Sequence, residues 1–248
     1  FPQPASRQDA IVAMSDMQSV VEFLGMLQRD IAANLSAFEI MWGSYYRAVT
    51  GDNGHRPPLS REYPFYVVFQ AEGTDPDGDT ARFERVLERA FEAGHIADAM
   101  IPKSAGEARA IWEIREDFEP ALVDPPYYLY DVSLPIRDMD AYVAQVEENV
   151  AKRWPGGTCI TLGHMADGNL HFIVAPGEQG DYHRASDECV YEPLKQYGGS
   201  VSAEHGIGLD KISWLPHSKS GDEIQLMRTL KRSLDPNNIL NPGRVLGH

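Results

Sequence analysis

Two histidines flank a predicted tight turn, and their type and spacing suit metal binding. They lie in Gly163-His164-Met165-Ala166-Asp167-Gly168-Asn169-Leu170-His171. Asp-Gly between two runs of strand-forming residues predicts a hairpin with a two-residue turn. That turn would pair His164 with His171, with Cβ atoms roughly 4.5–5.5 Å apart. Two such imidazoles can converge on one ion, since zinc–nitrogen bonds are about 2.0–2.1 Å long. The simpler alternative is two ordinary polar residues on a half-buried hairpin.

A third ligand and a base can come from Glu204 and His205. These residues lie in a glycine-rich stretch that contains Gly198, Gly199, Gly206 and Gly208. Glycines allow unusual backbone angles and a close approach of the backbone to a ligand. Two histidines, one glutamate and an open position form the arrangement found in catalytic zinc sites. The alternative is a solvated loop.

These motifs together resemble a known family. The pattern H-x-x-D-G-N-x-H is followed by S-x-E-H-G-I-G and then by Leu234-Asp235-Pro236-Asn237-Asn238-Ile239-Leu240-Asn241-Pro242-Gly243-Arg244. With Trp112-Glu113-Ile114-Arg115-Glu116 and Tyr130-Asp131-Val132-Ser133-Leu134-Pro135, the chain resembles the C-terminal half of FAD-linked oxidases. That group includes D-lactate, glycolate and D-2-hydroxyglutarate dehydrogenases, within the vanillyl-alcohol-oxidase-like flavoproteins. The likeness covers nearly the whole chain in the same order.

The resemblance implies roles for five residues. Arg115 corresponds to the arginine that binds the substrate carboxylate, whereas its spacing alone favours a surface ion pair with Glu119. His164, His171 and Glu204 would hold a divalent metal, zinc in the usual case. His205 would take the proton of the substrate hydroxyl, while hydride from C2 passes to the flavin.

The resemblance also indicates which residues lie near the flavin and which contact the tail of the substrate. Asn241 and Arg244 resemble the closing segment that packs near the flavin. Leu129 and Ile173 replace the lysine and asparagine of the 2-hydroxyglutarate type, so they predict a 2-hydroxy acid with an apolar tail. Asp167 and Asn169 are explained as turn residues.

The chain has no sequence motif for holding a pyrophosphate, because neither a G-x-G-x-x-G after a strand nor a P-loop is found. The resemblance therefore implies an N-terminal FAD-binding domain outside this chain as a partner. The start at Phe1 predicts a fragment or a processed chain. We predict a substrate domain at 1–177 and a helical segment at 178–248 that packs toward the FAD domain. The electron acceptor is unidentified, and a homo-oligomer is possible.

Composition excludes several classes of protein. The net charge of −15 disfavours nucleic acid and anionic membranes as partners. No apolar run approaches the ~20 residues of a transmembrane helix. Cys159 and Cys189 show no metal-knuckle or redox spacing, and this predicts a reducing, cytoplasmic location.

The hydrophobic pattern predicts an α+β fold, a mostly antiparallel sheet with helices packed on one face and a C-terminal helical segment. Expected helices cover about 6–31, 83–90, 104–119, 142–150, 179–197 and 224–234. Expected strands cover 35–41, 65–69, 96–101 and 127–134, besides the hairpin.

The resemblance therefore predicts that the chain is the substrate-binding and catalytic half of an FAD-dependent D-2-hydroxy-acid dehydrogenase, which oxidises a 2-hydroxy acid to a 2-oxo acid. Two alternatives use the same His/His/Glu ion without redox chemistry. One is a metal-binding module for a small molecule, and the other is a metallohydrolase.

Overall fold

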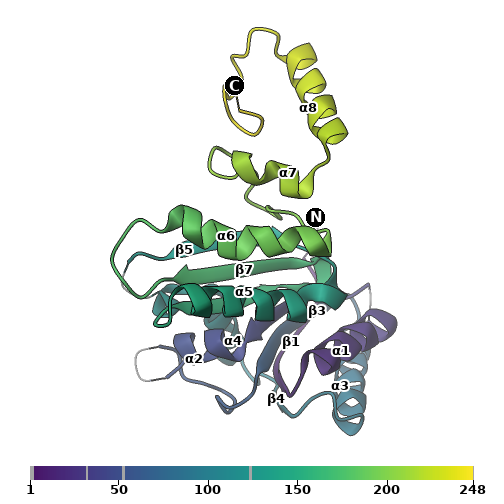
Figure 1. The fold of residues 1–248 in the computed structure, drawn as a ribbon. Helices are drawn as coiled ribbons and strands as arrows, with labels where there is room; N and C mark the ends of the chain where they lie inside the picture. Colours follow the sequence, from purple (N-terminus) through teal and green to yellow (C-terminus); the bar gives the residue numbers. More distant parts are fainter. Residues whose placement is uncertain (1–2, 32, 52–53, 123–124, 248) are drawn as a thin grey trace. The chain divides into compact units, whose positions relative to one another are not determined.

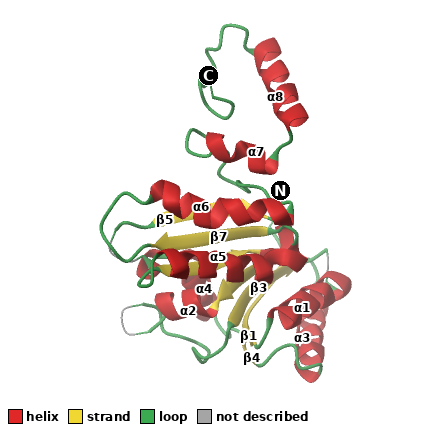
Figure 2. Ribbon diagram, viewed as in Figure 1, coloured by secondary structure: helices red, strands yellow, loops and turns green. Residues whose placement is uncertain are grey.

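The computed structural model describes residues 3–31, 33–51, 54–122 and 125–247. Its strands follow the order β4-β1-β3-β2-β6-β7-β5 in a seven-stranded sheet (Figures 1 and 2). Five strand pairings among the described residues are antiparallel. They join β1 to β3 and β4, β2 to β3 and β6, and β5 to β7. The predicted α+β class with a mostly antiparallel sheet is therefore confirmed, as are the C-terminal helices.

The chain divides into two compact units. The first contains residues 1–125 and 160–167, and the second contains residues 126–159 and 168–248. This division differs from the predicted boundary at 177/178. That boundary separates a substrate domain from a C-terminal helical segment expected to pack toward an FAD domain, and it stays a prediction.

The first unit has helices on both faces of its strands. Strands β1 (Ser6–Met14), β2 (Leu35–Trp42), β3 (Phe65–Gly73) and β4 (Asp98–Met100) form the layer, with most of β6 (Thr158–His164) beside β2. Helices α1 (Met17–Asp30) and α3 (Pro76–Glu92) cover one face through Phe23, Phe69 and Phe83, whose rings are in contact. Helices α2 (Gly43–Val49) and α4 (Ala105–Glu116) contact β3 on the other side, where Tyr46 stacks on Tyr66.

The predicted helix over 6–31 is wrong in its first third. Residues Ser6–Met14 form strand β1, and the helix begins after Asp16, whose carboxylate accepts a hydrogen bond from the Ser19 N–H. Ala10 to Met14 are fully buried, because strands pair on both sides of β1 and helices cover it. A strand buried on both faces shows no alternation of polar and apolar residues, so nothing local distinguished it from the helix that follows.

The second unit is a two-stranded ribbon covered by helices on one face. Strands β5 (Tyr128–Ser133) and β7 (Asn169–Ala175) pair in register, with Asp131 opposite His171 and Leu129 opposite Ile173. Helices α5 (Met139–Arg153) and α6 (His183–Leu194) lie side by side over this ribbon (Figure 1). The Tyr142 ring of α5 contacts Phe172 of β7. Successive residues of a strand point to opposite faces, so Leu129, Asp131, His171 and Ile173 lie on the face away from these helices.

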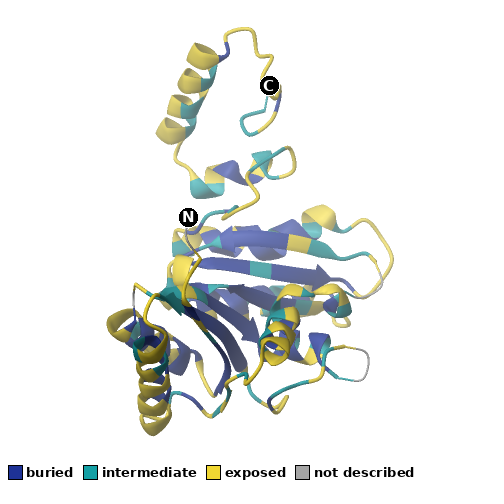
Figure 3. Cartoon of the chain, turned by 180° about the vertical axis from the view of Figure 1, so that it is seen from behind, coloured by how far each residue is buried: buried dark blue, intermediate teal, exposed yellow. Residues whose placement is uncertain are grey.

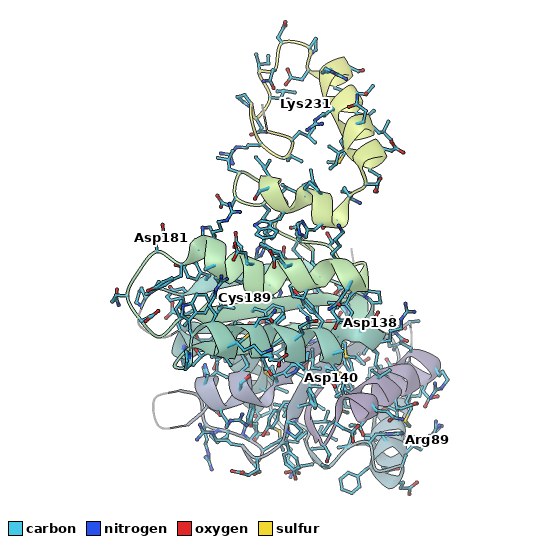
Figure 4. All side chains as sticks on the ribbon, viewed as in Figure 1. Arg89, Asp138, Asp140, Asp181, Cys189 and Lys231 are labelled. Atoms are coloured by element: carbon cyan, nitrogen blue, oxygen red, sulfur yellow. The ribbon has the colours of Figure 1, made fainter. Side chains whose placement is uncertain are left out.

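The C-terminal part comprises α7 (Leu215–Ser218) and α8 (Gly221–Leu234). Ser220 caps α8 in a capping box with Glu223. No residue of α8 is buried, and Leu226, Leu230 and Leu234 are among its exposed side chains (Figure 3). The lysine labelled on α8 in Figure 4, Lys231, contacts Asp235 and donates to the Leu240 carbonyl oxygen, which fixes the turn after the helix.

The connection between β6 and β7 is wider than predicted. A short 3₁₀ helix, Met165–Asp167, precedes Gly168, so His164 ends β6 and Asn169 begins β7. Gly168 has φ +83°, and a Cβ there would lie 2.8 Å from the Leu134 carbonyl oxygen. The Asp-Gly signal therefore marked the turn correctly, but the two-residue turn is wrong. No described helix is both long and apolar enough to cross a membrane.

Candidate active site

In the second unit the structure brings His171, Glu204 and His205 together. His171 lies on β7, and its Nε2 is 4.0 Å from Oε1 of Glu204. The imidazole rings of His171 and His205 lie 6.1 Å apart and within 25° of parallel. An ion with ligand bonds of about 2.0–2.1 Å can bridge two atoms up to about 4.2 Å apart. The His171 nitrogen and the Glu204 oxygen therefore satisfy the distance condition for sharing one ion.

Asn169 orients the Glu204 carboxylate. Its side-chain amide donates a hydrogen bond to Oε1 of Glu204, and the residue is only 2% exposed. The Asn169 Oδ1 atom is buried and has no hydrogen-bond partner among the described atoms. The interpretation of Asn169 as a turn residue is therefore wrong, because it is the first residue of β7 and contacts a candidate ligand. Because Asn169 directly follows Asp-Gly, turn chemistry alone explained its presence, and its hydrogen bond to Glu204 was not predicted.

The carboxylate of Asp131 holds the loop that carries Glu204 and His205. It is fully buried on β5 and accepts hydrogen bonds from the N–H groups of Ala203, Glu204 and His205. Burial by itself raises the pKa of Asp131, but the N–H donors of His205 and Glu204 and the charge of Lys211 outweigh it, so the pKa is lowered. Asp131 is therefore ionised at neutral pH.

In the first unit Glu39 joins the two other candidate residues. Glu39 lies on β2 opposite His164 of β6. Its Oε1 is 2.9 Å from Nδ1 of His164, and its Oε2 is 2.9 Å from Nη2 of Arg115. A carboxylate that accepts from Nδ1 fixes the histidine tautomer in which Nε2 carries the lone pair that can accept a hydrogen bond or bind a metal. The Arg115 Nη2 atom lies 3.5 Å from that Nε2.

Arg115 is held deep in the first unit, not on its surface. Its side chain is 11% exposed, and the Tyr45 hydroxyl donates to the Arg115 carbonyl oxygen at 3.0 Å. The predicted alternative, a surface pair with Glu119, is therefore wrong. The Nε atom of Arg115 is buried and has no hydrogen-bond partner among the described atoms. A buried N–H without a partner costs free energy, so this donor favours an anionic ligand beside Arg115.

The remaining candidate residues lie in two places. Leu129 and Ile173 pair across β5 and β7, with Leu129 54% exposed and Ile173 buried. Asn241 and Arg244 line a hollow of about 330 Å³ beside α8, together with Leu230. Asn241 has φ +49°, a left-handed backbone angle that asparagine tolerates better than most residues.

Sequence reasoning missed Glu39 and the role of Asp131. Glu39 was predicted only as one residue of a strand. It lies among apolar residues and is 8% exposed in the structure. A buried glutamate is rare, so it needs a partner. That feature of Phe38-Glu39-Ile40 was the available signal. Asp131 was noticed only as part of a motif, although it too lies in a strand between apolar neighbours.

Comparisons with known proteins identify the family of the chain. The family described as FAD linked oxidases, C-terminal domain, matches residues 3–245. A probable mitochondrial D-2-hydroxyglutarate dehydrogenase of Oryza sativa subsp. indica is 35% identical over 96% of this chain, which spans 43% of that relative. A Schizosaccharomyces pombe protein, provisionally named a mitochondrial D-lactate dehydrogenase, is 32% identical over 97% of this chain and 48% of its own length.

The fold is shared with a solved structure. The crystal structure of p-cresol methylhydroxylase with substrate bound superposes with a TM-score of 0.70, at 15% identity, over 99% of this chain and 54% of that one. At this identity the likeness shows the fold alone. The chain spans about half the length of the relatives it matches. The match over residues 3–245 shows that the chain belongs to the C-terminal domain family of the FAD-linked oxidases, and it is related to D-2-hydroxyglutarate and D-lactate dehydrogenases.

Proposed function

We propose that this chain is the substrate-binding half of an FAD-dependent D-2-hydroxy-acid dehydrogenase. The observation that carries the proposal is Arg115, an arginine whose side chain is 11% exposed and whose Nε has no hydrogen-bond partner among the described atoms, in a chain of this family. A guanidinium binds a carboxylate through parallel hydrogen bonds and with opposite charge. Arg115 is therefore proposed to bind the α-carboxylate of the substrate.

We propose His164, His171 and Glu204 as the ligands of a divalent metal ion. Each offers one ligand atom, and imidazole nitrogens with a carboxylate oxygen are a donor set that suits zinc. When bound, such an ion polarises the substrate hydroxyl and lowers its pKa. The donor chemistry fits the ion, and Glu39 would orient His164 by accepting from its Nδ1. We propose zinc as this metal, in preference to iron or manganese.

His205 is the proposed general base. Its side chain is 65% exposed and its ring lies beside that of His171, so the imidazole is open to an incoming hydroxyl group. A neutral imidazole nitrogen can accept a proton, which suits the removal of a hydroxyl proton. FAD, held by a domain outside this chain, supplies the acceptor for the hydride of C2.

We propose that the substrate has an apolar tail. Leu129 and Ile173 form a cross-strand pair on the ribbon face that also carries His171 and Asp131. A distal carboxylate next to two aliphatic side chains would be desolvated without a counter-charge, which costs several kcal/mol. The Oryza sativa relative is named for 2-hydroxyglutarate, a diacid, so this preference would set the chain apart from it, whereas the Schizosaccharomyces pombe relative is named for D-lactate.

The C-terminal segment is the proposed contact with the FAD domain. Helix α8 exposes Leu226, Leu230 and Leu234, and Asn241 and Arg244 follow in the turn beyond it. Exposed apolar side chains in a row at helical spacing indicate a surface that another part of the protein covers. The homo-oligomer and the cytoplasmic location stay predictions.

The test uses the full-length protein that contains residues 1–248. It should bind FAD, and a D-2-hydroxy acid should bleach the flavin absorbance without oxygen. Arg115→Met should raise KM at least tenfold, because the carboxylate loses its counter-charge. Arg89→Met, which removes an exposed arginine paired with Asp30, is the matched control and should change KM little. A full-length protein that binds zinc but no flavin would favour the two alternatives without redox chemistry.

A further inference from the structure

The carboxylate of Asp131 accepts four hydrogen bonds from one short loop. Within 3.1 Å it accepts from three successive backbone N–H groups, those of Ala203, Glu204 and His205, and from the Ser202 hydroxyl. Consecutive N–H groups that point at one anion force the backbone to wrap around it. The conformation of residues 202–205 is therefore set by a side chain on β5, more than 70 positions earlier in the chain.

The wrapped backbone determines where the next side chains go. The N–H groups of Glu204 and His205 point at Asp131, and both side chains reach the neighbourhood of His171, at 4.0 Å and at a ring separation of 6.1 Å. Asn169 then fixes the rotation of the Glu204 carboxylate by donating to its Oε1. Asp131 thus controls the main chain of this loop, and Asn169 controls the carboxylate of one residue in it.

Lys211 makes this arrangement possible in a fully buried place. Its Nζ lies 3.6 Å from Oδ2 of Asp131 and donates to the Asp131 carbonyl oxygen at 3.2 Å. A buried carboxylate without a counter-charge would be strongly unfavourable, but Asp131 has both a cation and several N–H donors. The negative charge can therefore stay on Asp131, where it is needed to accept four donors at once.

We infer that Asp131 is a positioning residue of the active site, which presents the metal ligand Glu204 and the base His205 together, with Asn169 as a second positioning residue for Glu204. This inference rests on the proposed function. It adds that one buried carboxylate, itself neither a ligand nor a base, determines both the metal affinity and the placement of the base.

Zinc binding by the 248-residue chain tests the inference without any need for FAD. Zn²⁺ affinity is measured by competition with a chromophoric chelator. Asp131→Asn keeps the shape of the side chain but removes the charge and replaces one acceptor oxygen by a donor. Loss of a group that orients a metal ligand typically costs 10–100-fold in metal affinity, and we expect a loss of that size. Asn169→Ala should cost a similar factor, because the Glu204 carboxylate loses its orientation.

Asp187→Asn is the matched control. Asp187 is also a buried aspartate of the second unit, but its partners are the Tyr130 hydroxyl, the Trp214 indole and the His183 imidazole, not the loop. This variant should bind zinc as the unchanged chain does, even if it is less stable. Equal affinities of the unchanged chain and a folded Asp131→Asn would overturn the inference. If Asp131→Asn does not fold, Ser202→Ala removes a single bond to Asp131 and should still weaken zinc binding about threefold. An unaltered affinity there would overturn it as well.

Amide hydrogen exchange separates this inference from the proposed function. If the unchanged chain binds no zinc, the metal proposal fails. The positioning role is then read from the N–H groups of Ala203, Glu204 and His205. They should exchange slowly in the unchanged chain and in Asn169→Ala, but quickly in Asp131→Asn. Exchange at the same rate in all three would show that Asp131 does not hold the loop.

Discussion

The buried pair of Glu39 and Arg115 gives a prediction whose size follows from the structure. The two side chains are 10% and 11% exposed, and their charged atoms are 2.9 Å apart. Removal of one partner from such a buried pair typically costs about 3–5 kcal/mol, because the other charge is left uncompensated. Glu39 also accepts from His164, so Glu39→Gln disturbs two partners at once. We expect Glu39→Gln to lower the free energy of unfolding by about 3 kcal/mol.

A double-mutant cycle isolates the pair. Glu39→Gln, Arg115→Gln and the double variant are unfolded in urea, and tryptophan fluorescence follows the transition. If the cost of each single change arises from an unpaired buried charge, the double variant should lose less than the sum of both. We expect a coupling free energy of about 1.5–3 kcal/mol, the range of hydrogen bonds to charged groups.

An exposed pair of the same unit serves as the control. Asp30 and Arg89 are 2.5 Å apart, but Arg89 is 52% exposed. Water screens such a pair, and exposed pairs usually contribute less than about 1 kcal/mol. Asp30→Asn should therefore change stability little. A coupling below about 0.5 kcal/mol between Glu39 and Arg115, no larger than that of the exposed pair, would refute the reasoning that the buried carboxylate holds Arg115 in place.

Three further predictions concern the turn, acid stability and substrate choice. Gly168→Ala forces a side chain onto φ +83° with a Cβ 2.8 Å from a carbonyl oxygen, so it should cost about 1–2 kcal/mol in urea unfolding, while Gly156→Ala, with open space around it, should not. The hydroxyl and guanidinium donors around Asp79 lower its pKa to about 2, so the stability it contributes is present above about pH 4 and lost between pH 4 and pH 2. Asp79→Asn should therefore lower the urea midpoint at pH 6 but not at pH 2, and an equal difference at both would contradict this. Leu129→Lys should raise kcat/KM for D-2-hydroxyglutarate relative to D-lactate by about tenfold in the full-length enzyme, since it supplies a counter-charge, and an unchanged ratio would remove Leu129 from the substrate site.

Most helices and strands were predicted correctly because the hydrophobic pattern that determines them lies within the segment itself. The amphipathic stripe of α3 buries Phe83, Val86 and Leu87, and the expected helix over 83–90 lies within its bounds. The short strand and the helix expected around 96–119 were found as β4 and α4, with ends displaced by a few residues. Strand β1 was missed, since its character depends on two neighbouring strands and on the helices that cover it. Those contacts are set by residues far away in the sequence.

In the candidate site, too, the residues with a local sequence signal were predicted and those without one were not. The histidines and Glu204-His205 were recognised because their spacing and the family resemblance are visible in the sequence. The groups that orient them were not, since each comes from a distant strand. Glu39 lies 125 positions before His164, and Asp131 lies 73 positions before Glu204. Only the pairing of β2 with β6 and the folding of a loop onto β5 bring these atoms together, and no local pattern specifies either event.

The orienting carboxylates also constrain how a substrate can bind. If the substrate carboxylate displaced Glu39 from Arg115, the buried Glu39 would lose its cation, and binding would lose several kcal/mol. The Nε atom of Arg115 removes this difficulty, because it is buried and has no hydrogen-bond partner among the described atoms. A carboxylate that binds through Nε satisfies that donor and leaves Glu39 with Nη2 and with His164. In the proposed role of Arg115, Glu39 would neutralise part of the arginine charge and would stay in place when a substrate carboxylate binds.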